Sequence, residues 1–445
     1  MNTIKKDFEN SFSKENLLLI YNEEISGSRS TGVDNISTKT FETDLENNII
    51  AARNRVLNGK YQFTRYKQKL ISKGENKTPR EVCIPTIRDR LILKALNQFL
   101  QKRLSDKIEQ PLPQSITKKI KASINDNPYD WVVKLDVADF YPSIRHEILN
   151  RNLRKFIRHG PALRLIEKAI EQSTKKSRKN ELGIPQGLPI SNILAALYLR
   201  NVDKHFQEKD NFFYQRYVDD VLILCSSKDA QDISENVIKR CKNIGLQVYD
   251  PQKRPDKSLS VPITNEFSYL GYRYNPTENL KALATTSKAS KQKLIDSLVG
   301  LFTAYQNSKR KSLGLLQWKV NLRITGCISE NKGRGWLFFF SEIDDQKTLF
   351  HLDNIVKSLC NHFNVSIELK RFARAWHEIN HNRWRNKYFP NFDKYDVNEM
   401  ALIVATHQGV KPEDLDISDE EIKATFWTIV RKEIREMDAD IQPFS

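Results

Sequence analysis

The sequence predicts an α+β fold in which a small, mostly antiparallel sheet is covered by helices. Three short runs rich in β-branched and aromatic residues occupy residues 131–137, 213–218 and 221–225. Apolar residues at helical spacing fill the segments between them, at residues 146–158 and 190–204. These runs predict one mixed domain over the middle of the chain, at roughly 125–275.

The segment before this domain is predicted to be helical and then to change period. Apolar spacing predicts helices at residues 15–25 and 38–57, with a Gly/Ser-rich turn between them. Residues 61–85 instead alternate apolar and polar side chains around a polar turn at residues 72–79, which predicts a hairpin. Helical spacing returns at residues 89–104.

Beyond about residue 285 the apolar spacing is again mostly helical. Helices are expected at residues 291–305, 349–360 and 418–435. Residues 322–340 look more strand-like, because apolar and aromatic residues are dense there.

The composition indicates a folded, basic protein. The 445 residues are 39% hydrophobic, enough for sizeable buried cores. Lys and Arg number 72 against 55 Asp and Glu, a formal charge of +17 that is spread along the whole chain. Such a surface favours polyanions, with nucleic acid the first candidate, although a basic but otherwise ordinary protein has the same balance.

Cysteine usage and hydropathy exclude several classes of protein. The five cysteines are odd in number, widely separated and never in a Cys-x-x-Cys pair, so neither a disulfide framework nor a zinc ribbon is expected. The N-terminal apolar run is broken by charges, and no run of eighteen apolar residues occurs. A cytoplasmic protein without a membrane segment is therefore expected.

Two acidic clusters lie beside predicted strands. Asp136 falls within residues 134–143, and Asp219 and Asp220 separate two further β-rich runs. Ionised carboxylates at a largely buried strand end are costly unless a hard divalent cation compensates them. Two such ions would suit the in-line displacement of pyrophosphate by a 3′-hydroxyl. The alternative is that the aspartate pair is simply a polar hairpin turn.

A Gly/Pro-rich loop at residues 183–192 lies between the two acidic clusters and leads into an apolar helix. Its glycines permit close approach of a backbone to a ligand, and Gln186 has an amide suited to a nucleotide or template. The alternative is a rigid turn with Ser191 or Asn192 as the cap of the following helix.

In this order and spacing, the three motifs resemble the reverse transcriptase family over roughly residues 20–275. Residues 136–141 resemble its first metal-binding motif, and residues 217–220 resemble its Tyr-x-Asp-Asp signature. Pro185-Gln-Gly187 resembles its template and nucleotide loop. The resemblance implies a right-hand polymerase with helical and hairpin fingers, an antiparallel-sheet palm, and a mainly helical thumb and C-terminal extension.

The resemblance also implies roles for individual residues. Asp136, Asp219 and Asp220 correspond to the catalytic carboxylates, and with Val137 they form the expected metal-binding set for two Mg²⁺ ions, with Mn²⁺ as a substitute. Tyr141 falls at the aromatic position that would exclude a ribose 2′-hydroxyl, which implies deoxynucleoside triphosphates as substrates. An ordinary core aromatic is the alternative for Tyr141.

Other positions are implied to hold the nucleotide, the template and the primer. The implied nucleotide-binding set is Lys73, Arg80, Tyr141 and Gln186. The implied template and primer contacts are Gly187, Tyr217, Leu270 and Gly271. Lys253, in a segment like the family's fourth motif, is a candidate general acid toward pyrophosphate, with a solvated surface lysine as the alternative.

The resemblance divides the chain into five expected parts. They are an N-terminal extension at 1–60, fingers at 61–130, a catalytic palm at 131–280, a thumb at 281–370 and a C-terminal helical region at 371–445.

Basic and aromatic residues after the palm suggest duplex tracking by the thumb and contacts to structured RNA. The thumb cations are Lys288, Lys291, Lys293, Lys309, Arg310, Lys311, Lys319, Arg323, Lys332 and Arg334. The accompanying tryptophans are Trp318, Trp336, Trp376 and Trp384.

Expected partners are an RNA template, a DNA product or primer, and deoxynucleotides, with the oligomeric state left open. No endonuclease-like Cys/His cluster follows the thumb and typical retron segments are missing, which favours an antiphage-defence enzyme with a cognate noncoding RNA. The alternative is a retron or group II intron-derived protein, including a maturase that acts mainly by binding RNA.

Overall fold

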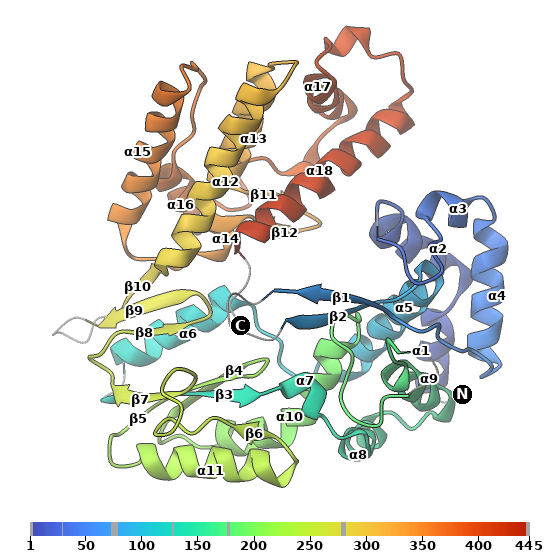
Figure 1. Cartoon of the computed structure of the whole chain (residues 1–445), viewed down its shortest axis with the longest axis vertical. Helices are drawn as coiled ribbons and strands as arrows, with labels where there is room; N and C mark the ends of the chain where they lie inside the picture. Colours follow the sequence, from blue (N-terminus) through green and yellow to red (C-terminus); the bar gives the residue numbers. More distant parts are fainter. Residues whose placement is uncertain are drawn as a thin grey trace. The chain divides into compact units, whose positions relative to one another are not determined.

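The computed structural model describes residues 3–28, 30–72, 79–126, 129–175, 179–276 and 282–441. The chain divides into two units (Figure 1). Unit 1 comprises Met1–Pro111 and Tyr129–Pro262, and unit 2 comprises Leu112–Pro128 and Ile263–Ser445. Both units combine helices with antiparallel strands, so the predicted α+β class is confirmed. In the described part of the chain, no helix is long and apolar enough to cross a membrane.

The N-terminal part of unit 1 is helical, as predicted. Its helices are α1 (Thr3–Ser11), α2 (Lys14–Ile20), η1 (Tyr21–Ile25), α3 (Thr38–Glu42), α4 (Leu45–Leu57) and α5 (Ile87–Leu104). Helix α5 begins where the Thr86 hydroxyl accepts a hydrogen bond from the Asp89 N–H at 3.2 Å. Most of its apolar residues are buried, because α1, α2 and α4 all pack around it.

The predicted hairpin is present but shorter than expected. Strands β1 (Lys67–Ile71) and β2 (Arg80–Ile84) pair antiparallel. The expectation of strand structure at residues 61–66 is wrong, because these residues pair with no neighbouring strand. Their alternation instead buries Tyr61, Phe63 and Tyr66 in the core.

A five-stranded antiparallel sheet forms the centre of unit 1. Its strands are β3 (Trp131–Ala138), β4 (Phe213–Tyr217), β5 (Asp220–Cys225), β6 (Gln247–Val248) and β7 (Leu259–Pro262). The order is β4-β5-β3-β6, and β7 also pairs with β3. The three predicted strands are thus confirmed, and β3 lies between its partners.

Helices cover this sheet. Those that pack on it are α10 (Ser191–Gln207) and α11 (Ala230–Asn243), whereas α8 (His146–Phe156) packs on α10 and α9 (Gly160–Glu171) packs on α8. The short helix α7 (Phe140–Ser143) follows β3 directly. Helix α11 lies against β3 and β6 (Figure 1), and α10 packs on β4. The helices predicted at residues 146–158 and 190–204 are confirmed as α8 and α10.

Unit 2 combines a three-stranded antiparallel sheet with a group of helices. The sheet has the order β10-β9-β8, from β8 (Phe267–Tyr269), β9 (Tyr272–Pro276) and β10 (Ala282–Thr286). Its helices include α6 (Pro113–Asp126), α12 (Lys288–Asn307), α15 (Gln346–His362), α16 (Phe372–His381), α17 (Val397–Gln408) and α18 (Asp419–Ile441). The three helices predicted after residue 285 are therefore confirmed as α12, α15 and α18.

The strand-like expectation for residues 322–340 holds only for the middle of the segment. Its centre forms the short antiparallel pair β11 (Cys327–Ser329) and β12 (Lys332–Arg334), whereas its two ends belong to α13 (Leu313–Thr325) and α14 (Trp336–Phe339). Gly326 and Gly335, with φ of 66° and 105°, separate these pieces. The apolar density reflects burial on all sides of two helix ends.

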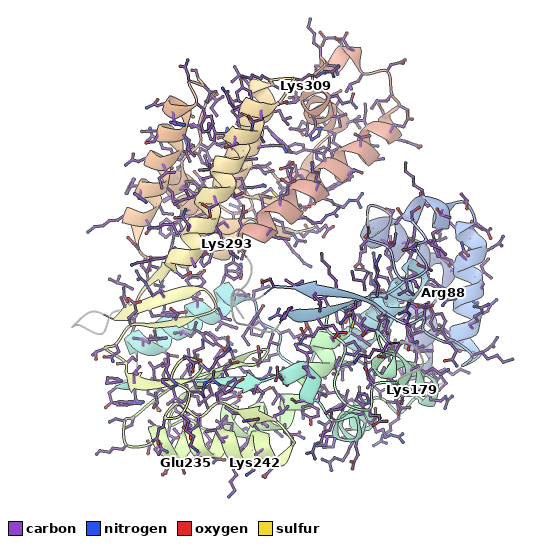
Figure 2. All side chains as sticks on the ribbon, viewed as in Figure 1. Arg88, Lys179, Glu235, Lys242, Lys293 and Lys309 are labelled. Carbon is purple, nitrogen blue, oxygen red and sulfur yellow. The ribbon has the colours of Figure 1, made fainter. Side chains whose placement is uncertain are left out.

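Some of the residues expected to track a duplex lie inside unit 2. The Arg323 side chain is 3% exposed and lies 3.2 Å from carboxylates of both Glu436 and Asp440. Lys319 pairs with the fully buried Glu433 at 2.7 Å. Trp336 is also buried. The ion pairs of Lys319 and Arg323 join α13 to α18. Lys293 and Lys309, in contrast, project from the ribbon (Figure 2).

Candidate active site

The central sheet brings the three predicted catalytic aspartates together. Asp136 on β3 is the register partner of Asp220 on β5. Asp219 occupies the turn between β4 and β5, and its carbonyl accepts a hydrogen bond from the Val137 N–H at 3.3 Å. Directly opposed residues of antiparallel strands have Cβ atoms about 5 Å apart, so the carboxylates share one small region.

Burial and mutual repulsion both act on these carboxyl groups. The pKa of Asp220 is raised to about 6, chiefly by desolvation, with the negative charges of Asp219 and Asp136 acting in the same direction and Lys134 opposing them. The Lys134 ammonium lies 3.8 Å from Asp220, and the Lys257 ammonium lies 3.7 Å from Asp136. Two lysines therefore supply the positive charge that this acidic cluster requires.

The donor chemistry of this cluster fits a hard divalent cation. Carboxylate oxygens are the ligands that Mg²⁺ and Mn²⁺ prefer. Within the described ranges, however, no group of three or more His, Cys, Asp or Glu side chains is preassembled around a metal position.

Tyr141 lies beside the aspartates, as the sequence suggested. Its hydroxyl donates to the Asn192 side-chain oxygen at 2.7 Å. Burial raises the pKa of Tyr141 to about 12, and the charge of Asp219 adds to the rise while that of Arg80 opposes it. Its neighbour Phe140 is 2% exposed and belongs to the core. Of these two aromatics, Tyr141 is the one that reaches the acidic cluster.

The Pro-Gln-Gly loop contacts the β1–β2 hairpin. The Gln186 carbonyl accepts a hydrogen bond from the Cys83 N–H at 2.7 Å. Gly187 has φ of +93°, and a Cβ there would meet Val82 Cγ1 at 2.7 Å. These contacts hold the loop against the later residues of β2, the strand that Arg80 begins. Lys73 lies outside the described residues.

The helix-cap alternative for Ser191 and Asn192 is wrong. Helix α10 begins at Ser191 and has no side-chain cap. The Ser191 hydroxyl instead donates to the Pro185 carbonyl at 2.6 Å, and Asn192 accepts from Tyr141. Both side chains stabilise the loop and the aromatic beside it.

In the segment like the family's fourth motif, the lysine nearest the catalytic candidates is not the one that the resemblance indicated. The Lys253 side chain is 82% exposed and lies 3.6 Å from Asp250. Lys257, four residues later in the same segment, is the lysine beside Asp136. Spacing alone could not choose between the two, since a loop carries them. Lys134 could have been found, because it is two residues from Asp136 on the same face of β3.

The remaining predicted contacts fall in both units. Tyr217 ends β4 as the register partner of Asp220, and burial raises its pKa. Leu270 and Gly271 form the turn between β8 and β9 in unit 2, with φ of 52° and 77°. Leu270 is 4% exposed, so its side chain supports the turn from within that unit.

Comparisons of the sequence with known proteins found two matches. Residues 71–274 match the family model described as reverse transcriptase (RNA-dependent DNA polymerase). Protein YkfC of Escherichia coli (strain K12) is 21% identical over 294 residues, covering 56% of this chain and 76% of that protein.

Solved telomerase structures are also similar. Telomerase from Candida albicans with a fragment of telomeric RNA is 13% identical at a TM-score of 0.45, covering 91% of this chain and 68% of that one. A truncated apo telomerase from Candida tropicalis is 15% identical at a TM-score of 0.40 and covers 51% of this chain. The present chain spans 55% of that truncated structure.

Proposed function

We propose that this chain is a reverse transcriptase in which Asp136, Asp219 and Asp220 catalyse DNA synthesis on an RNA template, because residues 71–274 match the family model described as reverse transcriptase (RNA-dependent DNA polymerase). The observation that carries this proposal is the pairing of Asp136 with Asp220 across β3 and β5, beside Asp219. This arrangement joins two sequence motifs in one buried, acidic region of the matched domain.

The three aspartates, with Val137 beside them, would hold two Mg²⁺ ions, or Mn²⁺ in their place. Bound metal would activate the 3′-hydroxyl and stabilise the leaving pyrophosphate. Lys134 and Lys257 balance the carboxylates in the metal-free protein and would be released from them when the ions bind. Lys253 is proposed to protonate pyrophosphate, and its exposure suits a group that must reach the leaving group.

The nucleotide would lie between the acidic cluster and the β1–β2 hairpin. Arg80 suits bidentate binding of the triphosphate, and Lys73 is proposed to assist it. Gln186 is proposed to contact the nucleotide, and the Tyr141 ring to exclude a ribose 2′-hydroxyl. The hydrogen bond from Tyr141 to Asn192 supports this role, because it restricts the ring beside the carboxylates.

Template and primer are proposed to contact the neighbouring turns. Gly187 offers an exposed backbone at the Pro-Gln-Gly loop. Tyr217, two residues before Asp219, is proposed as a further contact. Leu270 and Gly271 would support the primer end.

We also propose the right-hand division of the chain. Fingers at 61–130 would include the β1–β2 hairpin, the palm at 131–280 the central sheet, and the thumb at 281–370 helices α12 and α13. Residues 1–60 and 371–445 would extend the two ends. The two units divide the chain differently, since Leu112–Pro128 and Ile263–Ser445 group together.

A basic surface on unit 2 supports a structured RNA as partner. Six cations form what we call the α16 basic cluster: Lys370, Arg371, Arg374, Arg383, Arg385 and Lys387. Arg374 stacks on Tyr388 at 4.4 Å, and both line a cavity of ≈ 380 Å³. The exposed Trp384 adds an aromatic face for an unpaired base.

The proposed biological role is antiphage defence with a cognate noncoding RNA. Sequencing the RNA and DNA that co-purify with the protein tests this role. One abundant noncoding RNA and its complementary DNA are expected, whereas a spliced intron or a branched RNA–DNA hybrid would contradict the defence role.

The rival function is RNA binding without polymerisation, as in a maturase. A primed RNA template, deoxynucleotides and Mg²⁺ separate the two. We expect DNA synthesis by the natural protein and a loss of at least about 100-fold when Asp219 and Asp220 are changed to Ala. Asp232→Ala, which removes an exposed carboxylate from α11, should leave synthesis unchanged. Tight RNA binding without any synthesis would establish the rival.

A further inference from the structure

The turn that carries Asp219 has a strained backbone. Val218 has φ of 55°, in the left-handed region that a β-branched residue rarely adopts. Such a conformation persists only where its surroundings hold it in place. Two backbone carbonyl groups of the turn accept hydrogen bonds. The Val137 N–H donates to the Asp219 carbonyl at 3.3 Å, and Arg216 Nη1 donates to the Val218 carbonyl at 2.7 Å.

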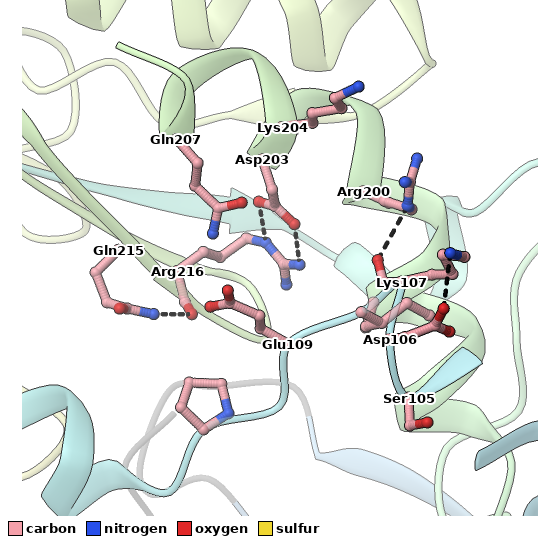
Figure 3. Close-up of a pocket in the computed structure, with 13 residues that line it drawn as sticks. Ser105, Asp106, Lys107, Glu109, Arg200, Asp203, Lys204, Gln207, Gln215 and Arg216 are labelled. Carbon is pink, nitrogen blue, oxygen red and sulfur yellow. Dashed lines mark hydrogen bonds and ion pairs between the residues drawn. The ribbon is translucent and has the colours of Figure 1, made fainter. Parts of the chain in front are cut away.

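Arg216 is itself anchored by Asp203 on α10. Its Nε and Nη2 donate to the two carboxylate oxygens at 2.7 Å and 2.5 Å (Figure 3). The two side chains are only 9% and 14% exposed. The Tyr214 hydroxyl also donates to Asp203, at 2.9 Å. The carboxylate is therefore fixed from two directions, and it fixes the guanidinium in turn.

One side of the Arg216 guanidinium faces a cavity, so packing does not hold the guanidinium there and its hydrogen bonds do. A cavity of ≈ 250 Å³ adjoins the pair and is lined also by Lys107 and Gln207 (Figure 3). Arginine suits the position because its planar guanidinium directs two donors to the Asp203 carboxylate and a third to the Val218 carbonyl. A lysine ammonium would keep the charge but not this geometry.

We propose that Asp203 and Arg216 are positioning residues that set the turn of Asp219 for metal binding. The proposal rests on the proposed metal-binding role of Asp219. Arg216 transmits the position of α10 to the Val218 carbonyl, and the held turn directs the following two carboxylates toward Asp136. Neither residue of the pair touches a substrate in this scheme.

Binding of Mn²⁺ to the purified protein, followed by electron paramagnetic resonance of the free ion, tests the proposal without requiring DNA synthesis. Arg216→Lys and the isosteric Asp203→Asn should each weaken Mn²⁺ binding by about 10–100-fold. Asp219→Asn should weaken it at least as much. Arg323→Lys disturbs an equally buried ion pair in unit 2 and should lower the unfolding temperature while leaving Mn²⁺ affinity unchanged.

The outcomes separate this proposal from the proposed function. If Asp219→Asn weakens Mn²⁺ binding but Arg216→Lys and Asp203→Asn bind as the natural protein does, the positioning role is overturned, even if both variants unfold at lower temperature. If all three weaken binding but the natural protein makes no DNA, the positioning role stands and the polymerase proposal fails.

Discussion

At the scale of single residues, Tyr141 is the ring that we propose selects the sugar of the incoming nucleotide. Its ring lies against the hydrophobic core, and its hydroxyl is bound to Asn192. Selection by exclusion would depend on the volume of the ring, whereas the hydrogen bond only restricts its orientation. The two contributions can be separated by substitution.

Replacing Tyr141 with Ala should raise ribonucleotide incorporation relative to deoxynucleotide incorporation, because the ring would no longer fill the space beside the 2′-carbon. Tyr141→Phe keeps the ring and loses only the bond to Asn192, so it should retain most of the discrimination. The ratio of kcat/KM for a deoxynucleotide and its ribonucleotide measures both effects. An unchanged ratio in Tyr141→Ala would contradict the steric role.

Asp440 shows how burial can outweigh an ion pair. It lies 3.2 Å from Arg323, yet desolvation raises its pKa from 3.8 to about 6, with Glu436 and Asp438 acting in the same direction. The folded state thus binds the Asp440 proton more tightly than the unfolded state does. This tighter proton binding adds to the free energy of unfolding in full below about pH 4, and the addition is lost as pH rises through about 6.

Asp440→Asn should therefore gain stability relative to the natural protein as pH rises from about 4 to 7, by up to about 3 kcal/mol for a shift of roughly two pKa units. Urea unfolding of both proteins, followed by tryptophan fluorescence at several pH values, measures the difference. Asp416→Asn, at an exposed site, should show no such trend. A constant difference across this range would refute the pKa shift.

At the scale of elements, the Pro-Gln-Gly loop and strand β2 depend on a close backbone approach. A Cβ on Gly187 would lie 3.0 Å from the Cys83 carbonyl and nearer still to Val82. Gly59, after α4, also has positive φ, but a Cβ there would meet nothing within 4 Å. The two glycines thus separate backbone strain from steric conflict.

Gly59→Ala should cost about 1–2 kcal/mol of unfolding free energy through backbone strain alone. Gly187→Ala should cost about 1–3 kcal/mol more, because β2 must also move. That movement should raise KM for deoxynucleotides, since Arg80 lies on β2. Chemical denaturation and steady-state kinetics measure these effects; equal losses in the two variants would show that loop and strand are not tightly packed.

At the scale of the whole molecule, the charge of +17 predicts RNA binding that weakens steeply with salt. Part of that dependence should come from the α16 basic cluster. Its cations neighbour a cavity and aromatic rings, whereas Lys228, Lys239 and Lys242 lie exposed on or near α11. Lys242 is labelled in Figure 2. Removing three positive charges from the α16 basic cluster, or three from α11, distinguishes binding at a specific site from an effect of net charge.

Changing Arg374, Arg385 and Lys387 to Ala should reduce the slope of log affinity against log salt by about 0.7 per lost contact with single-stranded RNA. Changing the three α11 lysines to Ala should alter it much less. Fluorescence anisotropy of a labelled RNA at several salt concentrations measures both slopes. Equal reductions would indicate that net charge, and not the α16 basic cluster, governs binding.

Local pattern was sufficient for much of this protein. Strand alternation, helical spacing and motif order predicted the central strands, about half of the helices and the aspartates that the sheet brings together. These features depend on neighbours close in sequence, whose periodicity is set by backbone geometry. The same local reasoning was right only for the middle of residues 322–340, because the two helix ends that flank the strand pair are buried and their composition resembles that of a strand.

Tertiary structure alone decided which charged groups meet. Sequence could not show that Lys257 rather than Lys253 approaches Asp136, that Arg323 is buried among carboxylates, or that Asp203 holds Arg216 behind the turn of Asp219. The physical reason is that the strength of a charge interaction depends on distance and desolvation. Both are set by segments far apart in the chain, which only packing brings together.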